Sequence, residues 1–538
     1  MTNSPRQVLI ILAALLFSAY PAFSQLPQIQ GRSPKARQNG FPVTNQAAAD
    51  AASSASRQEW FRIEYDGKAV GYESLTTTPV FADPEVSAGS IDGLIRRSRE
   101  TRLKLKRFGN DLSLSARLET VETSTGVLKT WSLRRTAADG AAMERSGIWN
   151  GDKGGFDVTE NVSGLSHNEL LPSRMQPRSA IMSAWLAAAS RDSQRLWTTA
   201  VLFPETSAIV DMQIRAAGGQ SLKLPDGKTI TVTRFDYWPT NSPEMKASVY
   251  YDDQMEVVRT EQLVLGLTMK MERTDAATAL GQSSTESLDL QFSSALPLKR
   301  QIQSIDRSES LQLSITVGAA EQISLPSGDF QSVEQKSAGE VLVTLTRAAP
   351  LQRTNQQEQA PATLQRNVRI NPAYISPTRW ITSEAPGVKR MGLFVAGGTS
   401  IADEKCRRLT THVWKQMRLS PFSTSLQPAE SIAKKLEGDC TEHAVLLCAL
   451  MRSQNIPSRV VVGFVYVSEP ASFVPHMWTE AILDGKWMPF DSTRGPDGMG
   501  LTHIKVTDSV LSDDIGSGNV LFVPLLSFLG RASVDVVQ

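Results

Sequence analysis

The stretch Gly438-Asp439-Cys440-Thr441-Glu442-His443 predicts the start of a helix and contains a candidate nucleophile. Asp439 can accept hydrogen bonds from the first free backbone amides of the helix, and Glu442 can bond back to the Asp439 amide as a capping box. Beyond this stretch, apolar residues recur at helical spacing, namely Ala444, Leu447, Cys448 and Met451. The pattern predicts an amphipathic helix whose first residue is Cys440.

A cysteine at the first residue of a helix has unusual chemistry. The unpaired amides and the positive end of the helix dipole stabilise an anion there, so they favour the thiolate form of Cys440. The same amides can donate to an oxyanion that forms during acyl transfer. Cys448 lies two turns further along the apolar face, where we expect it to be unreactive. Cys440 is therefore the candidate catalytic nucleophile.

A hairpin predicted downstream supplies an imidazole and a carboxylate. Asp484-Gly485 is a two-residue turn signal between alternating segments that contain His476 and Asp491. With position 483 paired to 486, counting outward places His476 opposite Thr493 and Asp491 opposite Trp478. His476 and Asp491 then lie diagonally on one face, about 7–8 Å apart at the backbone and within side-chain hydrogen-bonding reach. We expect His476 to be the general base and Asp491 to orient it.

Each of these residues also has a plain structural interpretation. A lone strand histidine, an aspartate before Ser-Thr and a cysteine at a helix start are all common without catalysis. A metal site formed by Cys440, His443 and His476 is a further alternative, since the first two lie one helical turn apart. His443 can equally cover the helix surface and no second cysteine cluster is present, so we expect neither a metal nor a cofactor.

Composition narrows the class of protein. The chain has 538 residues, of which 41% are hydrophobic and 21% charged, with a net charge of +1. This length suggests several domains, and the near-neutral charge makes nucleic acid an improbable partner. We expect a protein or peptide substrate instead.

The first residues predict an export signal. Arg6 precedes an apolar run at positions 8–17, and Ala22-Phe23-Ser24 fits the small-x-small pattern for cleavage before Gln25. The run is shorter than the roughly 20 residues that a membrane-spanning helix needs, although an uncleaved anchor is the alternative. We expect residues 1–24 to be removed, and the mature chain to be periplasmic or secreted without a stable membrane span.

The remaining sequence predicts a long β region followed by a helical one. Residues 25–58 form a flexible lead-in, and 59–347 alternate with period two as a mostly antiparallel β accessory region. Residues 348–371, rich in Gln, Pro, Thr and Ala, predict a linker. Helical periodicity then begins the candidate catalytic domain, 372–538. The expected fold class is α+β.

Three cysteines are too few for a disulfide scaffold. Cys440 and Cys448 lie about 12 Å apart along the predicted helix and cannot pair without melting it. Cys406 and Cys448 either form a disulfide, which leaves Cys440 free, or are two small buried residues.

Four motifs together carry a resemblance to a known family. They are Gly438-Asp439-Cys440-Thr441-Glu442-His443-Ala444, Ile456-Pro457-Ser458-Arg459-Val460-Val461-Val462-Gly463, His476-Met477-Trp478-Thr479-Glu480, and Gly485-Lys486-Trp487 with Asp491-Ser492-Thr493. In this order they resemble the core of the transglutaminase-like superfamily, a papain-like cysteine fold, over roughly residues 371–500. The resemblance implies that Cys440 is the nucleophile, His476 the general base and acid, and Asp491 the orienting carboxylate.

The expected function is a cysteine enzyme that acts on amide bonds through a thioester. The superfamily contains hydrolases and transamidating acyltransferases, so the resemblance leaves the acceptor open between water and an amine. We favour hydrolysis, as in a peptidase or amidase, because water is always available and no amine pocket can be identified. The rival hypothesis is a binding or scaffolding protein with a vestigial transglutaminase-like domain.

Overall fold

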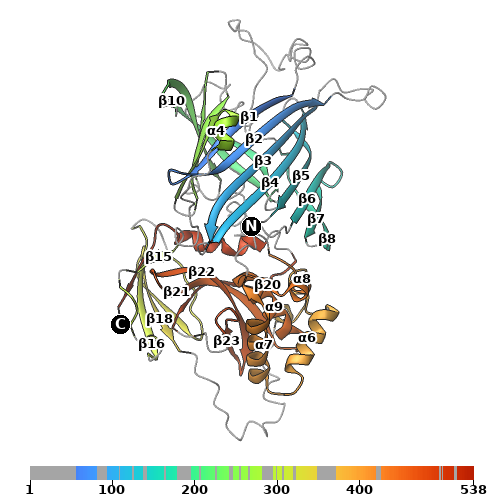
Figure 1. The fold of residues 1–538 in the computed structure, drawn as a ribbon, viewed down its shortest axis with the longest axis vertical. Helices are drawn as coiled ribbons and strands as arrows, with labels where there is room; N and C mark the ends of the chain where they lie inside the picture. The colour runs from blue at the N-terminus through green and yellow to red at the C-terminus, as the bar shows by residue number, and fades with distance from the viewer. Residues whose placement is uncertain are drawn as a thin grey trace. The chain divides into compact units, whose positions relative to one another are not determined.

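The computed structural model describes residues 56–80, 94–177, 196–281, 295–347 and 371–537, apart from short gaps inside these ranges. Within them the chain is mostly antiparallel β-sheet, with a group of helices in the C-terminal part (Figure 1), which confirms the predicted α+β class. The chain divides into two compact units, and the main boundary follows residue 288. The predicted signal peptide, nearly all of the lead-in and nearly all of the linker lie outside the described residues.

Unit 1 is built on one antiparallel sheet. Its strands are β1 (Arg57–Tyr65), β2 (Lys68–Val80), β3 (Leu94–Arg107), β4 (Asn110–Thr123), β5 (Leu128–Thr136), β6 (Ala142–Asn150), β7 (Gly155–Val162), β8 (Leu165–Pro172), β9 (Trp197–Phe203), β10 (Ala208–Lys223), β11 (Thr229–Pro239), β12 (Ala247–Tyr251), β13 (Val257–Val264) and β14 (Leu267–Thr274). The described strands follow the order β8-β7-β6-β5-β4-β3-β2-β1-β14-β13-β12-β11-β10-β9. Two meanders therefore meet where β1 pairs with β14, and a short helix, α4 (Ala276–Gly281), follows.

The alternation in the sequence is what forms these strands. Phe61, Ile63 and Tyr65 are at most 3% exposed, while the intervening positions are more polar. The turn at Asp66-Gly67 has positive φ at both residues, as a tight hairpin turn requires. The hairpin predicted from this stretch is confirmed, with a bulge between Ile63 and Glu64.

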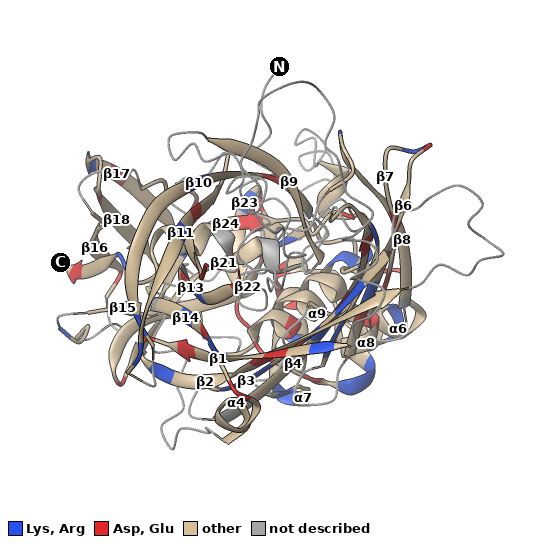
Figure 2. Ribbon diagram, turned by 90° about the horizontal axis from the view of Figure 1, so that it is seen from above, with Lys and Arg blue, Asp and Glu red and all other residues tan. Residues whose placement is uncertain are grey.

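The buried face of unit 1 also carries ion pairs. Acidic and basic residues are interspersed along strands β1 to β4 (Figure 2). Arg97 pairs with Glu122, and Arg145 pairs with Glu160, although all four are nearly inaccessible to solvent. Arg145 also donates to the carbonyl oxygen of Pro204 at 3.1 Å. Pairing and hydrogen bonds offset the cost of removing these charges from water.

Among the described residues, unit 2 contains the helices other than α4 and three smaller sheets. Its elements are β15 (Leu296–Pro297), β16 (Ser310–Thr316), β17 (Gln331–Ser337), β18 (Glu340–Thr346), η5 (Pro372–Tyr374), α6 (Pro386–Ala396), α7 (Ala402–Gln416), β19 (Arg418–Leu419), α8 (Ala429–Lys435), β20 (Glu437–Gly438), α9 (Cys440–Ser453), β21 (Ser458–Ser468), β22 (Ala471–Leu483), β23 (Lys486–Phe490), β24 (His503–Ser509), η6 (Gly518–Ser527) and β25 (Ser533–Val536). Helix α9 packs on β22 and β21 and is surrounded by α6, α7 and α8 (Figure 1). No helix among the described residues is long and apolar enough to cross a membrane.

The segment 296–346 lies in unit 2, whereas the sequence suggested that it continues the accessory β region to residue 347. The reason is strand pairing. β15 pairs with β22, and the described sheet β17-β18-β16-β25 is completed by the strand at the C-terminal end. Period-two alternation identified these strands, but it carries no information about their distant partners.

Replacement of Glu160 by Ala tests the buried ion pairs of unit 1. It removes the carboxylate from a buried guanidinium, so the free energy of unfolding should fall by about 3 kcal/mol in a denaturant titration. Glu144→Ala is the matched control, because Glu144 pairs with Arg134 at the surface, where the two side chains are 53% and 65% exposed. It should cost less than about 1 kcal/mol. Equal losses would contradict a special role for the buried pair.

Candidate active site

Cys440 lies at the first residue of α9, as the sequence predicted. The Asp439 carboxylate accepts from the Thr441 backbone amide at 2.9 Å, and the Asp439 amide donates to Glu442 at 3.0 Å, so the capping box is complete. The rest of the helix is buried from Glu442 to Arg452, whereas Cys440 keeps intermediate exposure. The thiol therefore lies at the accessible start of an otherwise buried helix.

The predicted hairpin forms in the predicted register. Strands β22 and β23 pair from Leu483↔Lys486 to Thr479↔Phe490, and β23 ends there, one residue before Asp491. The Nε2 atom of His476 lies 2.9 Å from Oδ2 of Asp491. The predicted contact between imidazole and carboxylate is thus confirmed, and both side chains are at least nine-tenths buried.

Two buried hydrogen bonds fix α9 against this hairpin. The hydroxyl of Thr479 on β22 donates to the carbonyl oxygen of Ala444 at 3.0 Å. The Nδ1 atom of His443 lies 3.1 Å from the carbonyl oxygen of Ser492, the residue after Asp491. Because these bonds begin one turn from Cys440, they hold the start of α9 in register with His476 and Asp491.

The electrostatics of the pair are dominated by burial and by mutual attraction. Burial acts to lower the pKa of His476, but the Asp491 carboxylate and the adjacent Cys440 thiol outweigh it and raise that pKa to about 10. Burial acts to raise the pKa of Asp491, but His476 and a second histidine, His503, hold it well below its usual value. Asp491 is therefore a carboxylate, and His476 is an imidazolium that holds its second proton strongly at neutral pH.

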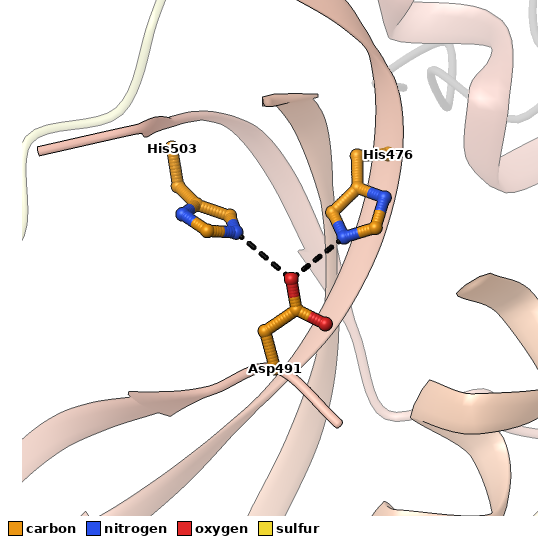
Figure 3. A group of neighbouring side chains, drawn as sticks. All are labelled: His476, Asp491 and His503. Carbon is orange, nitrogen blue, oxygen red and sulfur yellow. Dashed lines mark hydrogen bonds and ion pairs between the residues drawn. The ribbon is translucent and has the colours of Figure 1, made fainter. Parts of the chain in front are cut away.

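His503 is the residue of this site that the sequence analysis missed. Its Nε2 atom lies 3.1 Å from the same Asp491 oxygen that contacts His476 (Figure 3). It comes from β24, which joins the sheet through β21 rather than through the His476 hairpin. The alternating pattern around His503 could have predicted a strand. The pattern does not say which strand β24 pairs with, so it could not have placed His503 beside Asp491.

The alternative metal site proposed from Cys440, His443 and His476 is not assembled in the described part of the chain. His443 is 3% exposed, and its Nδ1 is directed at the Ser492 carbonyl. The alternative that His443 covers the helix surface is therefore wrong. Among the described residues, His476, Asp491 and His503 are the cluster whose side chains are of the types that bind metal ions. Their contacts at 2.9 and 3.1 Å are those of two N–H donors sharing one carboxylate oxygen.

The three cysteines are free thiols in the structure. Cys406 is fully buried on α7, and burial raises its pKa. Cys448 is also buried, with its sulfur 3.4 Å from the Ser458 hydroxyl. Cys406 and Cys448 are therefore two small buried residues in the structure, and they do not form the alternative disulfide.

Replacement of Asp491 by Asn tests the buried charge pair through the pH dependence of stability. A histidine whose folded pKa is raised from 6.5 to about 10 stabilises the fold fully below pH 6.5, and this contribution is lost as pH rises through 10. The carboxylate contributes above pH 3.8 and loses its contribution as pH falls through its lowered folded pKa. Asp491→Asn should therefore cost about 3 kcal/mol near pH 5 and progressively less toward pH 10.

Denaturant titrations across that pH series measure the difference between variant and parent. Asp484→Asn, in the exposed turn of the same hairpin, is the matched control and should give a small difference at every pH. A difference for Asp491→Asn that does not change with pH would contradict the pairing.

Comparisons with known proteins agree with this geometry in the C-terminal part. Residues 393–492 match the model of the transglutaminase-like superfamily, which spans Cys440, His476 and Asp491. No curated protein matches the chain.

Three solved structures show weaker similarity. A candidate cysteine protease from Cytophaga hutchinsonii shares 17% identity, covering 42% of this chain and 86% of its own, with a TM-score of 0.28. A β-barrel-like protein of unknown function from Brucella abortus shares 8%, covering 40% and 95%, with a TM-score of 0.28. A candidate protease from Parabacteroides distasonis shares 14%, covering 69% of each chain, with a TM-score of 0.19.

TM-scores this low carry no conclusion, so the assignment depends on the family model. A domain of that family fits a cysteine enzyme. The C-terminal part of the chain therefore carries a domain of the transglutaminase-like superfamily.

Proposed function

We propose that this chain is a cysteine-nucleophile enzyme that acts on amide bonds of a protein or peptide substrate through a thioester intermediate. The observation that carries the proposal is the buried hydrogen bond between His476 and Asp491 beside Cys440. A thiol, an imidazole and an orienting carboxylate are the groups that nucleophilic acyl transfer requires. The transglutaminase-like domain supports the same chemistry.

The mechanism follows from which atoms face each other. Nε2–H of His476 donates to Asp491 Oδ2, and Nδ1 holds the proton that comes from the Cys440 thiol, so an imidazolium lies beside the thiolate. The thiolate attacks the carbonyl carbon of the substrate amide. The backbone N–H of Cys440, which the Asp439 cap does not use, donates to the oxyanion. Collapse breaks the C–N bond, and the amine leaves with the proton from His476.

The thioester on Cys440 is then transferred to an acceptor. His476 removes a proton from water, and the water oxygen bonds to the thioester carbonyl carbon. The C–S bond then breaks, the carboxylic acid is released, and Cys440 regains its resting pair with protonated His476. A primary amine in place of water would give a new amide and make the enzyme an acyltransferase. We propose hydrolysis as the main reaction, because water is always present at the accessible start of α9.

We also propose that the enzyme acts after export, as a periplasmic or secreted protein. The support is the n-region with Arg6, the apolar run 8–17 and the Ala22-Phe23-Ser24 pattern. N-terminal sequencing of the exported chain should begin at Gln25, and an intact Met1 would contradict cleavage.

Replacement of Cys440 by Ala tests the proposed nucleophile. The chain is incubated with a glutamine-containing protein, a mixed peptide library and a fluorescent primary amine, while ammonia release, peptide cleavage and amine incorporation are followed together. We expect cleavage or ammonia release that falls at least about 1,000-fold in the variant, because a triad loses its function when the nucleophile is removed.

Cys406→Ala is the matched control, because Cys406 is fully buried on α7 and should leave activity unchanged. Cys440-dependent amine incorporation would make the enzyme a transamidase instead. Activity that persists in Cys440→Ala would overturn the proposed mechanism and favour a binding or scaffolding role for the domain.

A further inference from the structure

His503 contacts the site but has no part in the mechanism above. It is 6% exposed, and its Nε2 donates to Asp491 Oδ2 at 3.1 Å. Its Nδ1 lies 2.8 Å from the hydroxyl of Thr502. The other Asp491 oxygen, Oδ1, accepts from the amide of Thr493 at 2.9 Å and from its hydroxyl at 2.6 Å. The carboxylate is therefore held by four hydrogen bonds, two on each oxygen.

The hydrogen bonds fix the tautomer of His503. Its charged neighbours are Asp491, His476 and Arg494, and burial lowers its pKa, so the ring is neutral. A neutral ring carries one proton, and Asp491 requires it on Nε2. Nδ1 must then accept from the Thr502 hydroxyl. The result is a chain of hydrogen bonds from Thr502 through His503 and Asp491 to His476.

The sheet explains why two imidazoles meet on one oxygen. His476 pairs with Gly463 of β21, and His503 pairs with Val465, two residues further along the same strand. Paired residues share a face, and so do residues two apart, so both imidazoles project from the same face on opposite sides of β21.

The Trp478 ring packs beside both imidazoles, 5.1 Å from His503 and 6.4 Å from His476, and the two imidazoles lie 5.8 Å apart. A Cβ at Gly463 would lie 2.0 Å from the Ile504 carbonyl oxygen and 2.9 Å from that indole, so the glycine makes room for both. The indole therefore contacts both imidazoles that bond to Asp491.

We propose that His503 is a positioning residue, which holds Asp491 ionised and oriented so that His476 keeps its Nδ1 directed at Cys440. This inference depends on the proposed cysteine chemistry. It extends the site from three residues to four and assigns the Thr502 hydroxyl as the group that sets the His503 tautomer. His503 itself does not touch the reacting atoms, so its effect acts through Asp491.

The test is the pH profile of Cys440 alkylation by iodoacetamide in the full chain, read by mass spectrometry of the Cys440 peptide. This readout needs no known substrate. His503→Ala removes a donor that orients Asp491, so His476 should pair less well with the Cys440 thiolate. The acid limb of the profile should then move up by about one pH unit, toward the profile of His476→Ala.

Two variants separate positioning from stability. His503→Gln keeps a donor for Asp491 and an acceptor for Thr502, and it should restore most of the profile. Ile504→Val makes a packing defect on the same strand, at a fully buried residue, without touching these hydrogen bonds, and it should leave the profile unchanged. An unshifted profile in His503→Ala, or an equal shift in Ile504→Val, would overturn the inference.

His476→Ala distinguishes this inference from the proposed function. If wild type and His476→Ala alkylate alike, the Cys440–His476 pair is inactive, and both proposals fail. If they differ but His503→Ala matches wild type, only the role of His503 fails. ¹⁵N spectra of histidine-labelled protein supply an independent check: His503 should be the neutral Nε2–H tautomer near pH 7.5, and a doubly protonated ring would contradict the inference.

Discussion

The site depends on one buried oxygen, Oδ2 of Asp491, which accepts hydrogen bonds from His476 and His503. A carboxylate that is 1% exposed is costly unless every lone pair is used. Here Thr493 satisfies the second oxygen, so the charge is retained in the interior. The retained charge makes His476 basic, and without it burial would make that imidazole a weak acceptor.

The same constraint explains how the elements of unit 2 are arranged. The three groups on Asp491 come from β22, β24 and the turn after β23, so the oxygen joins three pieces of chain. Helix α9 is attached to this assembly through His443 and Thr479 rather than through Cys440 itself. Cys440 therefore remains accessible at a helix end, while His476 and Asp491 are buried.

Unit 1 shows the opposite use of buried charge. Arg145 and Glu160 pair across neighbouring strands and belong to no described cluster of metal-ligand type. In unit 2 a buried imidazole and carboxylate are arranged beside a thiol that a substrate can reach. Burial of charge alone thus does not distinguish the two units, and the accessible thiol of Cys440 beside the buried pair makes unit 2 the candidate site.

Local sequence determined the start of α9 and the His476 hairpin. Capping by Asp439 and Glu442 and the turn at Asp484-Gly485 act within a few residues, so spacing alone placed Cys440 at a helix start and His476 near Asp491. Only the tertiary structure brought His503 to Asp491 and the segment 296–346 into unit 2. Those contacts depend on strands that pair across long separations, and alternation gives the face of a strand but not its partner.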